Sequence, residues 1–142
     1  MTPKRVLFIC THNSARSQIA EAWMKHLGGA AFEVESAGLQ PGTLKPLVIE
    51  AMREVGIDLS SKSTQTIADV LKSERPFDYV VTFYDQKKAG QCPTFLGEIA
   101  RRHWDIPERL KAPVPQEEQL AHVRSVRELI KQRVEAWLAE NS

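Results

Sequence analysis

Cys10 and Arg16 are the residues of this chain whose types and spacing best suit covalent chemistry on an anion. Cys10 ends the apolar run over residues 5–10, and Arg16 directly precedes an amphipathic stretch over residues 17–27. In such an arrangement of strand, loop and helix, the backbone N–H groups of the loop and the positive end of the helix converge on the space beside the end of the strand. That field favours a thiolate over a thiol, and a guanidinium binds a tetrahedral oxyanion through two hydrogen bonds. The spacing therefore predicts a cysteine nucleophile inside an anion-binding loop.

The loop that joins these two residues carries mostly small and polar side chains. We expect the oxyanion to be bound by Thr11, His12, Asn13, Ser14, Ala15, Arg16 and Ser17. The Ser17 hydroxyl has two compatible roles, as a donor to the Cys10 sulfur and as the N-cap of the helix. The alternative is that Cys10 is a buried, inert strand-end residue and Arg16 a solvated first-turn arginine. The position of the pair between a buried strand and an amphipathic helix favours the catalytic interpretation.

The elements that must position this loop alternate along the chain. Hydrophobic periodicity and turn residues predict strands over residues 5–10, 32–37, 77–83 and 98–103. Helices are predicted over residues 17–27, 46–55, 67–71 and 117–138, and residues 85–93 are predicted to form a surface loop. Strands that alternate with helices indicate an α/β fold with a mainly parallel sheet.

Length and composition exclude several classes of protein. The 142 residues suit one domain, and 42% hydrophobic with 26% charged residues are ordinary for a globular chain. The formal charge of +1 gives no basic excess for nucleic acid or an anionic membrane, and no apolar run approaches the roughly 18 residues of a membrane span. The two cysteines make neither a disulfide scaffold nor a structural zinc site. We therefore expect a cytoplasmic protein with no nucleic-acid or membrane partner.

The segment over residues 6–18, VLFICTHNSARSQ, resembles the active-site loop of the low-molecular-weight tyrosine phosphatase fold. More specifically, it resembles the arsenate reductases built on that fold. The features that favour the arsenate branch are Gln18, the Ser36-Ala37-Gly38 turn, the Cys92-Pro93 pair and His103-Trp104. The resemblance extends over nearly the whole chain. It implies a single domain over residues 1–142 with three layers, in which a central parallel sheet of about four strands is flanked by helices.

The activity that the resemblance implies is a redox cascade. The Cys10 thiolate attacks arsenate to form a covalent thiol-arsenate adduct, while Arg16 and the loop amides stabilise the oxyanion. A second thiol then attacks Cys10 and releases arsenite, and an external reductant resets the disulfide. No bound cofactor is expected. The reductant is thioredoxin, glutathione with glutaredoxin, or mycothiol.

The second thiol is where the sequence departs from the thioredoxin-coupled members of this family. Those members carry two further cysteines, one at the end of the third strand and one in the loop after it. Tyr84 takes the place of the former, and only Cys92 remains. Either Cys92 attacks Cys10 directly, or a small thiol such as glutathione or mycothiol does so. A third interpretation is that Cys92 is a spare loop thiol.

The general acid and a metal site of the family also differ here. The family has an Asp-Pro pair four residues after the tryptophan, where this chain has Glu108, with Asp105 as the nearby substitute. Both carboxylates could instead be solvated loop residues. Some members bind potassium, and Asn13, Glu21 and Ser36 match those positions. Gln65 stands where an Asp ligand is expected, so we predict no metal.

Two rival functions use the same loop. A phosphatase would attack a phosphate monoester with Cys10 and hydrolyse the phosphocysteine, with Tyr84 or Trp104 as an aromatic wall beside the loop. A binding module would sense oxyanions without turnover, although it would not require the nucleophile.

Overall fold

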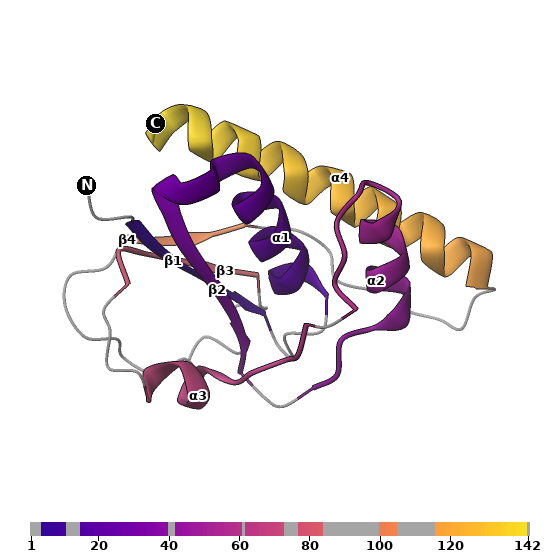
Figure 1. The fold of residues 1–142 in the computed structure, drawn as a ribbon, viewed down its shortest axis with the longest axis horizontal. Helices are drawn as coiled ribbons and strands as arrows, with labels where there is room; N and C mark the ends of the chain where they lie inside the picture. Colours follow the sequence, from indigo (N-terminus) through magenta and orange to yellow (C-terminus); the bar gives the residue numbers. More distant parts are fainter. Residues whose placement is uncertain are drawn as a thin grey trace.

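The computed structural model describes residues 4–10, 15–39, 42–60, 62–72, 77–83, 100–104 and 116–141 of the chain. Every strand and helix predicted from the sequence is present, with small shifts at the ends (Figure 1). In chain order the elements are β1 (Lys4–Cys10), α1 (Arg16–Gly28), the 3-10 turn η1 (Gly29–Ala31), β2 (Phe32–Gly38), α2 (Pro46–Arg53), α3 (Ile67–Leu71), β3 (Tyr79–Thr82), β4 (Ala100–His103) and α4 (Gln116–Asn141). The loop predicted over residues 85–93 lies outside the described residues.

The four strands form one parallel sheet in the order β2-β1-β3-β4. The predicted parallel sheet of about four strands is thus confirmed. Its strands end nearly level, because Cys10 is the partner of Gly38, Ile9 of Thr82, and Thr82 of His103. In open α/β sheets, ligands bind at the carboxyl ends of the strands. This edge is therefore where the candidate catalytic residues must be sought.

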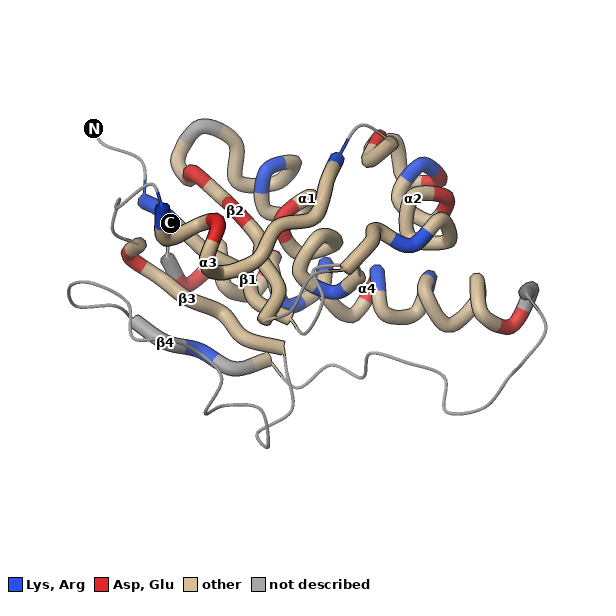
Figure 2. The backbone as a smooth tube through the Cα atoms, turned by 90° about the horizontal axis from the view of Figure 1, so that it is seen from below, with Lys and Arg blue, Asp and Glu red and all other residues tan. Residues whose placement is uncertain are grey.

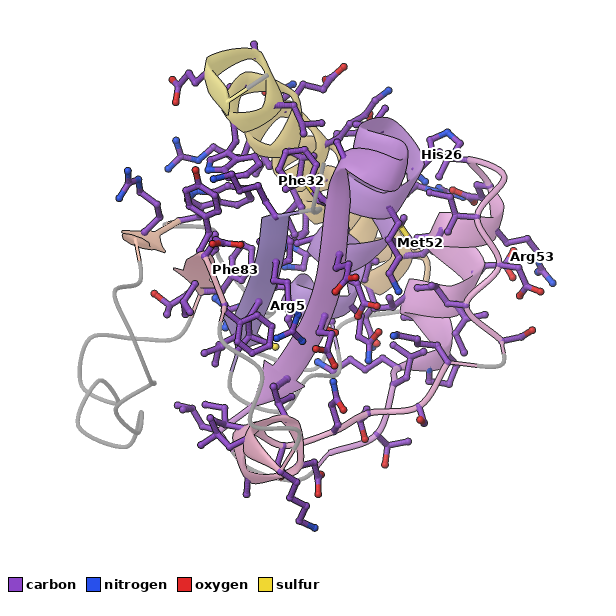
Figure 3. The ribbon with its side chains drawn as sticks, turned by 60° about the vertical axis from the view of Figure 1, so that its left-hand side comes forward. Arg5, His26, Phe32, Met52, Arg53 and Phe83 are labelled. Carbon is purple, nitrogen blue, oxygen red and sulfur yellow. The ribbon has the colours of Figure 1, made fainter. Side chains whose placement is uncertain are left out.

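Side chains of β1 point alternately into two cores. Phe8 and Cys10 pack with buried residues of α1, α2 and α4, whereas Leu7 and Ile9 pack with Ile67 and its neighbours in α3. Figure 1 accordingly shows α1, α2 and α4 on one face of the sheet and α3 on the other. Within α2, Met52 lies toward the core and Arg53 points outward (Figure 3). The three-layer arrangement expected from the sequence is confirmed, and burial on both faces explains why residues 5–10 are almost continuously apolar.

Glycines follow the first two helices at backbone positions that suit them. Gly29 has φ of 57° after α1, and Gly56 has φ of 84° just beyond α2. A residue without Cβ adopts this left-handed conformation at little cost, so both glycines let the chain turn back toward the sheet. Leu27, which follows the apolar spacing of α1, is nevertheless exposed, since the buried part of that helix ends at Met24.

The C-terminal helix α4 closes the larger core. Its apolar spacing buries Val126, Ile130, Val134 and Trp137. Acidic and basic residues occur along both α2 and α4 (Figure 2). None of the helices in the described part of the chain is long and apolar enough to cross a membrane.

Candidate active site

Cys10 is the last residue of β1 and lies at the carboxyl edge of the sheet. Its side chain is fully buried, and its carbonyl accepts a hydrogen bond of 3.1 Å from the amide of Leu39, just after β2. Its Sγ lies 2.9 Å from Oγ of Ser17, and either atom can be the donor. The contact expected between Ser17 and the Cys10 sulfur is therefore present, and it holds the sulfur against the first turn of α1.

The N-terminus of α1 has a positive helix end that no described side chain caps. Its N-cap is Ala15, which has no side-chain oxygen, so the interpretation of Ser17 as N-cap was wrong. No acidic residue stands in the first turn, and among the described residues no side chain caps the helix. The first amides of a helix lack intrahelical partners and carry the positive end of the helix dipole. A thiolate or an oxyanion beside Ser17 is stabilised by both effects.

Arg16 is buried and directed at the end of β3. Only 5% of the residue is exposed, which rules out a solvated first-turn arginine. Its Nη1 donates to the carbonyl of Phe83, and the guanidinium carbon lies 5.9 Å from the centre of the Phe83 ring. The Phe83 amide in turn donates to the carbonyl of Ile9 at 2.8 Å. Arg16 is thus bound to Phe83, which is itself hydrogen-bonded to β1, the strand that ends at Cys10.

The segment over residues 62–66 is hydrogen-bonded both to α1 and to the end of β2. Nε2 of the buried Gln18 side chain donates to the Ser63 carbonyl at 3.2 Å. Gln65 Nε2 donates to the carbonyl of Ser36 at 2.8 Å, and its own carbonyl accepts from the Gly38 amide at 2.9 Å. Ser36-Ala37-Gly38, expected as a turn, is the end of β2. Gln18 and the end of β2 are thus tied to one segment.

Glu21 is a buried carboxylate one helical turn beyond Ser17. It accepts a hydrogen bond of 2.5 Å from Ser36 Oγ and contacts Lys25 Nζ at 2.5 Å and Lys62 Nζ at 2.6 Å. Sequence reasoning missed both lysines. The spacing of four residues from Glu21 was a signal for Lys25, but nothing local points to Lys62.

The potassium ion that the resemblance implies does not fit these residues. Two ammonium groups already contact Glu21 Oε2, and the Ser36 hydroxyl donates to Oε1. The Gln65 side chain presents its amide nitrogen, not a carboxylate, to this region. Asn13 lies outside the described residues. Across the described part of the chain, no group of three or more His, Cys, Asp or Glu is suited to a metal.

Trp104 follows β4 and is part of the core. It is 5% exposed, and its ring centre lies 5.6 Å from that of Phe8 and 5.7 Å from that of Phe83. Its amide donates to the Thr82 carbonyl at 2.9 Å. Such a residue anchors β4 and does not form an exposed aromatic wall beside the loop.

The structure brings Cys10, Ala15, Arg16 and Ser17 together at one end of α1. The other site residues predicted from the sequence lie outside the described residues: Thr11, His12, Asn13, Ser14, Tyr84, Cys92, Asp105 and Glu108.

Comparison with known proteins gives a consistent result. The family model described as low molecular weight phosphotyrosine protein phosphatase matches residues 5–141. An arsenate reductase of Bacillus licheniformis is 37% identical over 138 residues, which cover 96% of each chain. A solved structure titled an arsenate reductase in the phosphate binding state superposes with a TM-score of 0.75 at 30% identity, covering 98% of this chain and 99% of that one. The thioredoxin-dependent arsenate reductase of Corynebacterium glutamicum superposes with a TM-score of 0.72 at 31% identity, covering 96% of this chain and 61% of that one.

Proposed function

The chain belongs to the low molecular weight phosphotyrosine protein phosphatase family, and from this premise we propose that it is an arsenate reductase that forms a thiol-arsenate adduct on Cys10. The observation that carries the proposal is the Cys10 sulfur held at the first turn of α1, next to a buried arginine. Its similarity to arsenate reductases over nearly its full length supports reduction as the outcome.

In the first step, the Cys10 thiolate attacks the arsenic of arsenate and an arsenate oxygen leaves as water. Arg16 and the amides over residues 11–17 bind the remaining oxygens, and the bidentate guanidinium suits their geometry. Arg16 Nη1 donates to the Phe83 carbonyl, which orients the guanidinium and leaves its other N–H groups as the donors proposed for the oxyanion. We propose Glu108 as the acid that protonates the departing oxygen, with Asp105 as its alternative. Comparing turnover of Glu108→Gln with that of Asp105→Asn distinguishes them.

In the second step, a thiolate attacks the Cys10 sulfur. The electron pair of the sulfur–arsenic bond passes to arsenic, which leaves as arsenite, and a disulfide forms. Two thiols are oxidised for each arsenic(V) reduced. We propose that Cys92 is the attacking thiol, because an intramolecular thiol has a high effective concentration. The alternative is a small thiol such as glutathione or mycothiol.

An external reductant must then restore the two thiols. Thioredoxin, glutathione with glutaredoxin, and mycothiol are the candidates. The structural similarity to an enzyme described as thioredoxin-dependent favours thioredoxin.

The test is arsenite production by the purified chain, assayed in parallel with each of the three reducing systems. We expect turnover with at least one system and none for Cys10→Ser. Hydrolysis of nitrophenyl phosphate is measured on the same samples. Ester hydrolysis without arsenite under any reductant would assign the chain to the phosphatases. The burial of Trp104 argues against that residue as an aromatic wall that contacts phosphotyrosine.

A further inference from the structure

Glu21 is a charged residue buried in the protein, and it lies outside the proposed pair of Cys10 and Arg16. Only 2% of it is exposed, yet it lies on α1 directly behind the site. Ser36 Oγ donates to Oε1, while Lys25 and Lys62 both contact Oε2. A carboxylate removed from water needs a counter-charge and hydrogen bonds, since an uncompensated buried charge is strongly destabilising.

The two lysines are not equivalent. Lys25 lies on the same helix, four residues after Glu21, and its side chain is 53% exposed. The Lys62 side chain is 33% exposed and comes from a segment 41 residues away in the sequence. Solvent therefore screens the charge of Lys25 more than that of Lys62, although both lysines contact the same buried carboxylate. The contact between Lys62 and Glu21 therefore depends on the tertiary fold, whereas the contact between Lys25 and Glu21 forms within one helix.

We propose that the Lys62 ammonium group is the internal counterion of Glu21 and takes the place of a bound alkali cation there. The ammonium nitrogen lies 2.6 Å from Oε2, within the range of a charge-assisted hydrogen bond. A further cation at this oxygen would be repelled by Lys62 and Lys25. The polar groups around it already have partners, because the Ser36 hydroxyl donates to Glu21 and the Ser36 carbonyl accepts from Gln65.

The consequence is that Lys62 acts as a positioning residue for the Cys10 region. Glu21 joins α1 to β2 through Ser36, two residues before Gly38, the sheet partner of Cys10. Lys62 also precedes Ser63, whose carbonyl accepts from Gln18. Neutralising Glu21 therefore keeps α1, the end of β2 and the 62–66 segment together.

The experiment measures thermal unfolding of the full chain in potassium, sodium and choline chloride at equal ionic strength. The wild-type midpoint is expected to be the same in all three salts, because the ammonium group already fills the cation position. Lys62→Met is expected to unfold about 3 °C lower or more in choline chloride. Potassium or sodium should restore part of that loss, since a cavity of about 440 Å³ lined in part by Glu21 and Lys62 admits an ion.

Two further variants complete the test. Lys72→Met removes a lysine whose side chain is 78% exposed and which pairs with Asp69 at 3.6 Å, and it should keep the wild-type midpoint in every salt. The double variant Glu21→Gln/Lys62→Met removes both charges and should lose the cation dependence. If Lys62→Met does not fold, folding of the double variant supports the proposal and its failure to fold contradicts it.

Three results overturn the proposal: a wild-type midpoint that rises in potassium over choline, a Lys62→Met midpoint equal to wild type, or a deficit that is the same in all three salts. The last would mean that Lys62 contributes packing only. None of these measurements uses arsenate, so they remain decisive whatever the outcome for the proposed reductase activity.

Discussion

The Cys10 sulfur lies 2.9 Å from the Ser17 hydroxyl, which links the last residue of β1 to the first turn of α1. A hydroxyl that donates to a thiolate stabilises the charged form of the sulfur, and hydrogen bonds to charged groups contribute about 1.5–3 kcal/mol. The thiolate, not the thiol, is the nucleophile. This contact therefore ties the reactivity of Cys10 to one side chain of the helix.

Ser17→Ala should slow alkylation of Cys10 by iodoacetamide at neutral pH by about tenfold or more. The rate is measured in a Cys92→Ser background, so that only one thiol reacts. Ser125→Ala on the outer side of α4 serves as the matched control and should leave the rate unchanged. Equal rates for Ser17→Ala and its parent would show that the hydroxyl does not stabilise the thiolate.

Arg16→Lys should lower arsenate turnover at least 100-fold while the chain still folds. Lysine keeps the charge but loses the planar fork that binds two oxyanion oxygens. Circular dichroism and thermal unfolding report the fold, and Arg53→Lys, at an exposed arginine of α2, is the control. A lysine variant with near wild-type turnover would mean that the oxyanion is not bound by Arg16.

Cys92→Ser should abolish the single turnover that reduced protein performs without external thiol. The wild-type chain is expected to release one equivalent of arsenite and to form a Cys10–Cys92 disulfide, visible by peptide mass mapping. Phosphate ester hydrolysis, if present, should persist in the variant because it needs no second sulfur. Full arsenite turnover of Cys92→Ser with glutathione or mycothiol, together with a mixed disulfide on Cys10, would assign the second step to the small thiol.

Glu54 should make the free energy of unfolding depend on pH in the acid range. Hydrogen bonds from Arg124 and Arg127 of α4 lower the pKa of this carboxyl from 4.5 to about 2. Because the pKa is lower in the folded state, the stabilisation is present above the unfolded value and is lost as the pH falls from about 4.5 to 2. Urea unfolding should show Glu54→Gln to be less stable than wild type at neutral pH, with a gap that closes over this interval.

The control for this prediction is Glu140→Gln near the end of α4, which should change the pH profile far less. A difference between Glu54→Gln and wild type that stays constant from neutral pH to pH 2 would contradict the assigned ion pairs.

Local pattern was sufficient to predict the elements of this fold. The apolar run before Cys10 predicted a strand buried on both faces, and the structure confirms it between two cores. Thr66 and Asp69 at the start of the short helix α3 form a capping box, a signal contained in four consecutive residues. Strand limits were less accurate, since β3 covers Tyr79–Thr82 whereas residues 77–83 were predicted. The amides of Asp78 and Phe83 still donate to carbonyls of β1, and no local pattern in the sequence marks where the regular strand pairing ends.

The sequence by itself determined the candidate nucleophile Cys10, the candidate oxyanion-binding Arg16 and the strand and helix that flank them, because these lie within one short segment. Only the tertiary structure decided where distant groups meet that segment. The Arg16 contact to Phe83 spans 67 residues, and the Lys62 contact to Glu21 spans 41. Trp104, considered as a wall of the site, proved to be buried between Phe8 and Phe83. Such contacts follow from the order of strands in the sheet and from the need to neutralise buried charge, which are properties of the packed chain and not of neighbouring residues.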